Sequence, residues 1–64
     1  MSYIILYSER YGYFESIHSG CVHHTQDFRS AANYKYLDRA MDMREYLHRR
    51  YNESYHIEVF SMEG

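Results

Sequence analysis

The densest group of side chains that could do chemistry lies between residues 18 and 24, where the sequence reads HSGCVHH. Its potential metal ligands are one thiol and three imidazoles, from Cys21, His18, His23 and His24. Zinc is bound by such groups, but structural zinc sites usually combine two ligand pairs that are separated in the chain. All four residues fall within seven positions, so we expect a polar surface loop with a free thiol and no cofactor. A zinc site formed by these residues is the alternative.

The same residues could form a catalytic pair, with Cys21 as the nucleophile and His23 or His24 as the base. That chemistry also needs an orienting carboxylate, an oxyanion site and a pocket large enough for a substrate. A small domain leaves little room for such a cavity. We therefore predict that the protein is not an enzyme.

The chain has 64 residues, which is enough for one small domain spanning residues 1–64. Cys21 is the only cysteine, so no disulfide can form within the chain. The net charge of −2 provides no overall attraction to phosphates, and no apolar run approaches the roughly 20 residues of a membrane helix. These features predict a protein of the reducing cytoplasm, without a membrane segment and without nucleic acid as its expected partner.

One segment, Asp38 to Tyr51, has the periodicity of an amphipathic helix. At about 100° per residue, apolar side chains in and just before this segment fall within roughly 60° of one line. They are Tyr36, Ala40, Met43, Leu47 and Tyr51. Most of the charged side chains fall on the far side, so we expect the helix to bury a single face.

Three segments are rich in β-branched and aromatic residues, and we expect each to be a strand. They are residues 3–7, 13–18 and 55–61. Residues 18–26 should form a loop. Phe28 and Ala31 indicate a short helical turn over 27–32, because they point more than about 100° away from the stripe of the main helix. A break follows at 33–36. The predicted fold is α+β, in the order ββ(α)αβ, with a three-stranded antiparallel sheet in the order 2-1-3 and the main helix on one face.

The first strand is apolar on both of its faces, although a single helix can cover only one of them. If Ile4 and Leu6 face the helix, apolar and aromatic side chains of the opposite face stay uncovered. They are Tyr3, Ile5, Tyr7 and Phe60, and Tyr46 on the helix is a second exposed aromatic candidate. The opposite pleat would also expose apolar side chains, so either arrangement predicts a contact surface for a foreign protein, a homodimer, or both.

Basic residues gather in the C-terminal half of the helix, at Arg44, His48, Arg49 and Arg50. Positive charge at this end complements the helix dipole, and Glu45 and Arg49 are spaced for a favourable i,i+4 pair. The alternative is a small nucleic-acid-binding regulator, in which Arg44, Arg49 and Arg50 contact phosphates and tyrosines stack on bases. The acidic net charge argues against that alternative.

A pattern of residues that determine the fold, and not a chemical activity, spans nearly the whole chain. It consists of a Tyr-Ile strand, a Gly-aromatic hairpin, an Asp-x-x-x-Ala-x-x-Tyr segment, an Ala that opens the helix, and a final Val/Ile strand. The residues that carry it are Tyr3-Ile4-Ile5, Gly12-Tyr13, Asp27, Ala31, Tyr34, Ala40 and Ile57-Glu58-Val59. This layout resembles that of small phage-encoded accessory proteins, whose characterised members often inhibit host defence or other host machinery by binding it. The Ser or Thr that usually caps the helix in that group is replaced here by Lys35-Tyr36. The resemblance implies a non-enzymatic binding protein in the cytoplasm of the host cell that docks on a host protein or complex and inhibits or modulates it.

Overall fold

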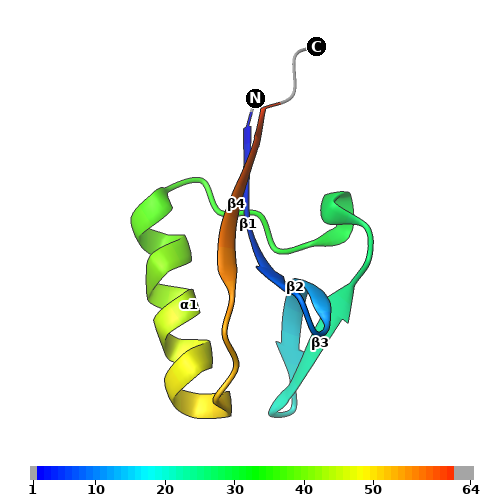
Figure 1. Ribbon diagram of the computed structural model, residues 1–64, viewed down its shortest axis with the longest axis vertical. Helices are drawn as coiled ribbons and strands as arrows, with labels where there is room; N and C mark the ends of the chain where they lie inside the picture. Colours follow the sequence, from blue (N-terminus) through cyan, green and yellow to red (C-terminus); the bar gives the residue numbers. More distant parts are fainter. Residues whose placement is uncertain (1, 62–64) are drawn as a thin grey trace.

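Residues 2–61, which a computed structural model describes, form a four-stranded antiparallel sheet with one helix packed against it (Figure 1). The elements are β1 (Ser2–Ser8), β2 (Gly12–His18), β3 (Cys21–Thr25), the 3-10 turn η1 (Phe28–Ser30), α1 (Leu37–Tyr51) and β4 (His56–Ser61). The strand order is β3-β2-β1-β4, and α1 and η1 lie on opposite sides of β1 (Figure 1). This is the small α+β fold that the sequence predicts. Within the described residues, no helix has both the length and the apolar character needed to cross a membrane.

The prediction of three strands in the order 2-1-3 is wrong, because the segment from Cys21 to Thr25, expected to be part of a loop, is the strand β3. Ser19 and Gly20 have φ angles of 52° and 79°, so they form a two-residue turn of the kind that joins tight hairpins. This turn places His18 opposite Cys21 and starts the pairing of β2 with β3. The polar composition of β3 fits its position at the edge of the sheet, where one side of the strand has no neighbour.

A hydrophobic core fills the space between α1 and the sheet. Its buried members are Leu6, Phe14, Ala40, Leu47 and Tyr55. Ile4 packs against the same cluster, so the pleat of β1 points Ile4 and Leu6 toward the helix. Phe14 and Ile17 both reach this core although they are three residues apart, because the register of β2 with β3 shifts between Phe14 and Ser16. Such a bulge inserts one extra residue and thereby brings both side chains to the same face.

The buried face of α1 agrees with its periodicity, except at the start of the helix. Ala40 and Leu47 are fully buried, and Met43 and Tyr51 are half-buried against the core. Tyr36, the remaining member of the predicted stripe, is 59% exposed. It is the N-cap residue, and its extended backbone conformation places it outside the helical repeat. The helix begins one residue earlier than predicted and ends where predicted.

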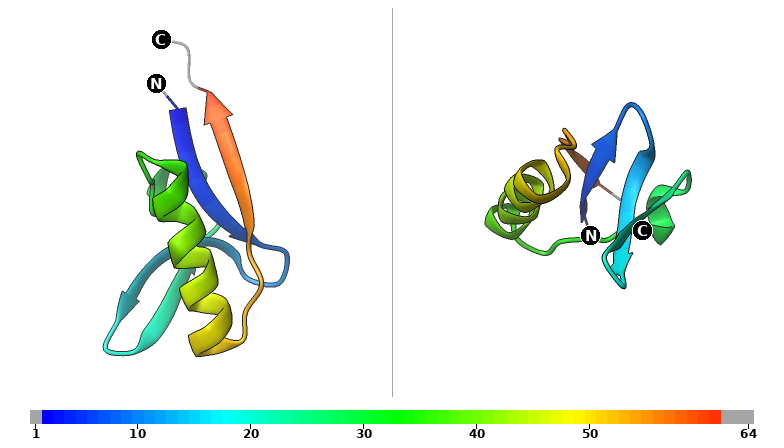
Figure 2. Two further views of the ribbon diagram at one scale, coloured as in Figure 1. Left: turned by 90° about the vertical axis from the view of Figure 1, so that its left-hand side faces the viewer. Right: turned by 90° about the horizontal axis from the view of Figure 1, so that it is seen from below.

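The segment between η1 and α1 carries the chain from one side of the sheet to the other. The backbone N–H of Ala32 donates to the carbonyl of Phe14 at 3.0 Å, and that of Tyr34 donates to the carbonyl of Ile4 at 2.8 Å. The side-chain oxygen of Asn33 accepts a hydrogen bond from the Ile4 N–H at 3.0 Å. β2 pairs with β1 only next to the turn that joins these two strands, and the β2–β3 hairpin then diverges from β1 and β4 (Figure 2). The connector takes the place beside β1 that β2 leaves free.

Replacing the fully buried Leu47 with alanine should lower the free energy of unfolding by about 2–5 kcal/mol, because it leaves a cavity in the core. The matched control is Leu37→Ala in the first turn of the same helix, where the leucine is 51% exposed and the loss should stay below about 1 kcal/mol. Urea denaturation followed by circular dichroism measures both values. Equal losses in the two variants would contradict this orientation of α1.

Candidate functional site

Five aromatic rings lie side by side on the face of the sheet opposite α1. They are Tyr3, Tyr7, Tyr13, Phe28 and Phe60, and we call them the five-ring surface. Their centroids form a continuous chain, with 5.8 Å from Tyr3 to Phe28 and 4.9 Å from Phe28 to Phe60. The chain continues with 6.5 Å from Phe60 to Tyr13 and 5.0 Å from Tyr13 to Tyr7. All five rings are half-buried, so each contacts its neighbours and also meets solvent.

Strand alternation and strand pairing bring these rings together. Tyr3 and Tyr7 alternate along β1 with the side chains that face α1. Phe60 lies opposite Tyr3 in β4, and Tyr13 lies opposite Tyr7 in β2. Phe28 comes from η1, packs edge-on against Tyr3 and stacks on Phe60. Four separate segments of the chain therefore build one aromatic face.

η1 is held in place by Asp27 at its N-terminus. The Oδ1 atom of Asp27 accepts a hydrogen bond from the backbone N–H of Arg29 at 3.0 Å and lies 3.3 Å from the Nε of the same arginine. The backbone hydrogen bond, supported by the side-chain contact, holds the pKa of the Asp27 carboxyl below its usual value. This cap fixes the start of the turn, and the next residue, Phe28, is thereby placed over the sheet.

The expectation that no element covers this sheet face is wrong, because Phe28 of η1 packs on it. Tyr3, Tyr7 and Phe60 were predicted as partner contacts and belong to the five-ring surface, whereas the fourth candidate, Ile5, is fully buried beneath it. The phase of Phe28 predicts a helical turn separate from the main helix, and η1 is that turn. That Phe28 packs on this face depends on its contacts with Tyr3 and Phe60.

Tyr46, the other predicted contact residue, lies on α1 and therefore on the other side of the sheet (Figure 1). Its side chain is 46% exposed and packs edge-to-face against Tyr51, with 6.3 Å between the ring centroids. Tyr46 lines an open cleft of about 390 Å³ together with charged residues of the same helix, Asp42, Glu45, Arg49 and Arg50. It does not share a contact surface with the five rings.

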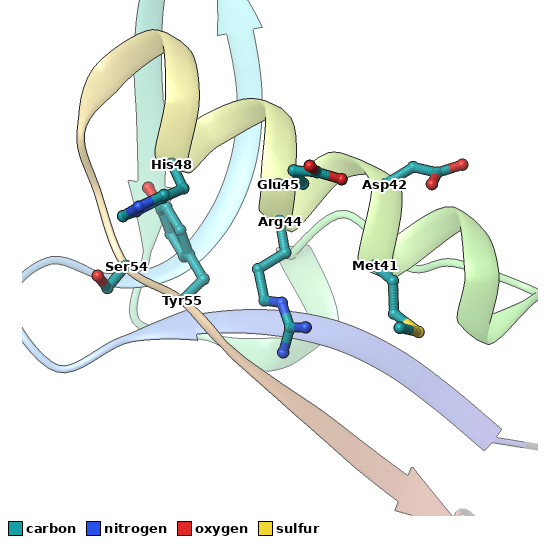
Figure 3. Close-up of a pocket in the computed structure, with 7 residues that line it drawn as sticks. All are labelled: Met41, Asp42, Arg44, Glu45, His48, Ser54 and Tyr55. Atoms are coloured by element: carbon teal, nitrogen blue, oxygen red, sulfur yellow. The ribbon is translucent and has the colours of Figure 1, made fainter.

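The three arginines of the predicted basic patch have separate surroundings. Arg49 Nη2 lies 2.8 Å from Glu45 Oε1, and the guanidinium of Arg50 lies 5.7 Å from the ring centroid of Tyr51. Arg44 is half-buried and reaches from α1 toward the start of β4 (Figure 3). All three lie on the helix side, so the fold does not bring them together with the tyrosines of the five-ring surface.

The histidines and the cysteine of the sequence cluster are divided between the two faces of the β2–β3 hairpin. His18, Cys21 and His23 share the outer face, where the rings of His18 and His23 lie 5.3 Å apart and Cys21 is exposed. His24 points to the helix side, so the four ligands of the alternative zinc site are not assembled. Among residues 2–61, no group of three or more His, Cys, Asp or Glu side chains is arranged to hold a metal ion.

His24 makes an interaction that the sequence does not reveal. Its Nε2 lies 2.6 Å from the hydroxyl of Tyr55, and its ring stacks on Tyr11 at a centroid distance of 5.1 Å. Burial lowers the pKa of His24, although the carboxylate of Glu53 opposes part of this shift. Burial also raises the pKa of Tyr55 to about 12, with smaller contributions from Glu53 and Tyr11. Both groups are therefore neutral near pH 7, and their hydrogen bond ties β3 to the segment that leads into β4.

Comparison with known proteins gives no match: no family model, no curated protein and no solved structure is similar to this chain. The resemblance to phage accessory proteins stays an expectation from the residue pattern.

Replacing His24 with glutamine should flatten the fall of the melting temperature between about pH 7.5 and about pH 5. The unfolded chain takes up a proton on His24 near the ordinary pKa of about 6.5, whereas burial lowers that pKa in the folded protein. The unfolded state therefore binds more protons as the pH falls. Stability that is present above the ordinary pKa is lost as the pH falls through the lowered pKa of the folded state.

The matched control is His18→Gln, which removes an exposed imidazole from the outer face of the same hairpin and should keep the wild-type pH profile. Melting temperatures measured by circular dichroism across the pH series decide the outcome. If the melting temperature of His24→Gln falls with pH as steeply as that of the wild type, protonation of a group other than His24 causes the loss of stability at low pH.

Proposed function

We propose that the protein is a non-enzymatic binding protein that docks on another protein through the five-ring surface. The observation that carries the proposal is the unbroken chain of half-buried rings that links four segments. Aromatic residues are enriched in the best-packed parts of interfaces, since they bring a large contact area with few rotatable bonds. Neighbouring rings already restrain one another here, so little side-chain freedom is left to lose on binding.

The proposed mechanism is steric occlusion of a surface that the partner needs. Ile5 lies between Tyr3 and Tyr7 on the same face of β1 and is fully buried, so the centre of the surface is closely packed. Glu58 lies opposite Ile5 in the β1–β4 pairing and places a carboxylate on the same face, beside Phe60. An apolar centre with a charged edge is typical of binding surfaces in which a few anchors provide most of the affinity.

The resemblance to small phage-encoded accessory proteins supports a host protein or protein complex as the partner and the host cytoplasm as the compartment. Binding would inhibit or modulate that partner, with host defence machinery as the expected class. A nucleic acid is a poor fit as the partner. The tyrosines that would stack on bases and the arginines that would contact phosphates lie on opposite sides of the sheet.

Combining Tyr7→Ala with Tyr13→Ala should weaken binding to the partner by roughly tenfold or more, because truncating anchor residues of an interface costs about 1–2 kcal/mol or more. Tagged wild-type protein and the variant are incubated with a bacterial lysate, and the captured proteins are compared by quantitative mass spectrometry. The dissociation constant is then measured with the purified partner, after circular dichroism has verified that the variant is folded.

The matched control is Tyr36→Ala, which removes an exposed tyrosine outside the five-ring surface and should leave capture unchanged. Tyr46→Ala tests the helix side in the same way. If the folded double variant keeps wild-type affinity, the five-ring surface is not the docking site. Loss of binding only in Tyr46→Ala would assign the contact to α1.

A further inference from the structure

β4 is an edge strand whose outer side is open. The sheet ends at β4, and no other strand of the described residues pairs with that side. Natural edge strands are usually protected by proline, lysine or a bulge. β4 contains no proline and no lysine, and its register with β1 is regular from end to end. Its one carboxylate, on Glu58, protects the edge only as long as it meets no partner. Val59 in its middle is 60% exposed. The other edge strand, β3, is polar and follows a bulge in its pairing with β2.

We propose that a second copy of this chain docks on β4, so that two β4 strands pair antiparallel about Ile57 and join the two four-stranded sheets into one. The proposal does not rest on the proposed function, although Glu58 also lies beside Phe60 at the edge of the five-ring surface. It also places the expected homodimer at the edge of the sheet instead of on its face.

Charge complementarity selects the register of this pairing. Residues directly opposite each other in antiparallel strands share a face, so β4 can pair with its own copy only about a central residue. Pairing about Ile57 puts His56 of each copy opposite Glu58 of the other, and an imidazole N–H can donate to the carboxylate. Pairing about Glu58 instead puts two carboxylates opposite each other. The internal contact of His56 with Glu9, at 3.7 Å and on exposed side chains, is weak enough to be exchanged.

A cleft on the helix side fits the same register. It has a volume of about 440 Å³ and lies between α1 and the chain that enters β4 (Figure 3). The lining residues are Met41, Asp42, Arg44, Glu45, His48, Ser54 and Tyr55. Pairing about Ile57 places Val59 of each copy directly opposite Tyr55 of the other, and both side chains point to the helix side. The exposed valine of one copy would therefore pack at the cleft of the second.

Sedimentation velocity of the full chain from about 1 to about 300 µM should show a concentration-dependent dimer. Glu58→Lys removes the carboxylate that accepts from His56 and puts an ammonium group opposite the imidazole N–H in the homodimer, so that donor meets donor. His56→Glu places two carboxylates opposite each other. Each variant alone should sediment as a monomer over this range. An equimolar mixture of the two should restore the dimer, because the introduced lysine then faces the introduced glutamate and His56 of one copy again faces Glu58 of the other.

Glu15→Lys, at the exposed bulge of β2, carries the same charge change away from β4 and should dimerise like the wild type. Circular dichroism verifies that each variant is folded. A wild type that stays monomeric at the highest concentration overturns the proposal. So do single variants that still dimerise, and so does a mixture that stays monomeric while the wild type dimerises.

Discussion

The strand β1 must be covered on both of its faces, and the rest of the fold follows from this constraint. Ile5 points to one face and Leu6 to the other, and both are fully buried. α1 covers the face of Leu6 with Ala40 and Leu47. Residues 2–61 form no second α-helix over the face of Ile5, and a single turn, η1, with the aromatic side chains of three strands, provides the cover instead.

Covering both faces requires the chain to pass from one side of the sheet to the other between η1 and α1. The passage is made where β2 turns away from β1, and hydrogen bonds from the connector to Ile4 and Phe14 replace the strand pairing that is lost there. The diverging β2–β3 hairpin is tied back by the hydrogen bond between His24 and Tyr55. The five-ring surface thus forms because its side chains cover one face of β1. Its rings stay half-exposed, which leaves them accessible for the proposed binding.

Features with local causes could be predicted from the sequence. The helix, to within one residue, the strands β1, β2 and β4, and the alternation that puts Tyr3 and Tyr7 on one face of β1 follow from periodicity. The place of Phe60 beside Tyr3 follows from the pairing register, which the sequence left open. The prediction missed β3, because an edge strand tolerates polar side chains and its Ser19-Gly20 turn resembles a loop. Other features depend on contacts between residues distant in the sequence. The packing of Phe28 on Phe60 and the link between His24 and Tyr55 are of this kind, and no local pattern encodes them.

The most direct measurement is the aromatic ring spectrum of the protein in solution, recorded by NMR before and after addition of the captured partner. The chain has nine tyrosines and three phenylalanines, so each ring can be followed individually. Binding at the five-ring surface predicts large shifts for Tyr3, Tyr7, Tyr13, Phe28 and Phe60, with Tyr36 and Tyr46 unchanged. Shifts confined to Tyr36 and Tyr46, with the five rings unchanged, would contradict docking through the five-ring surface.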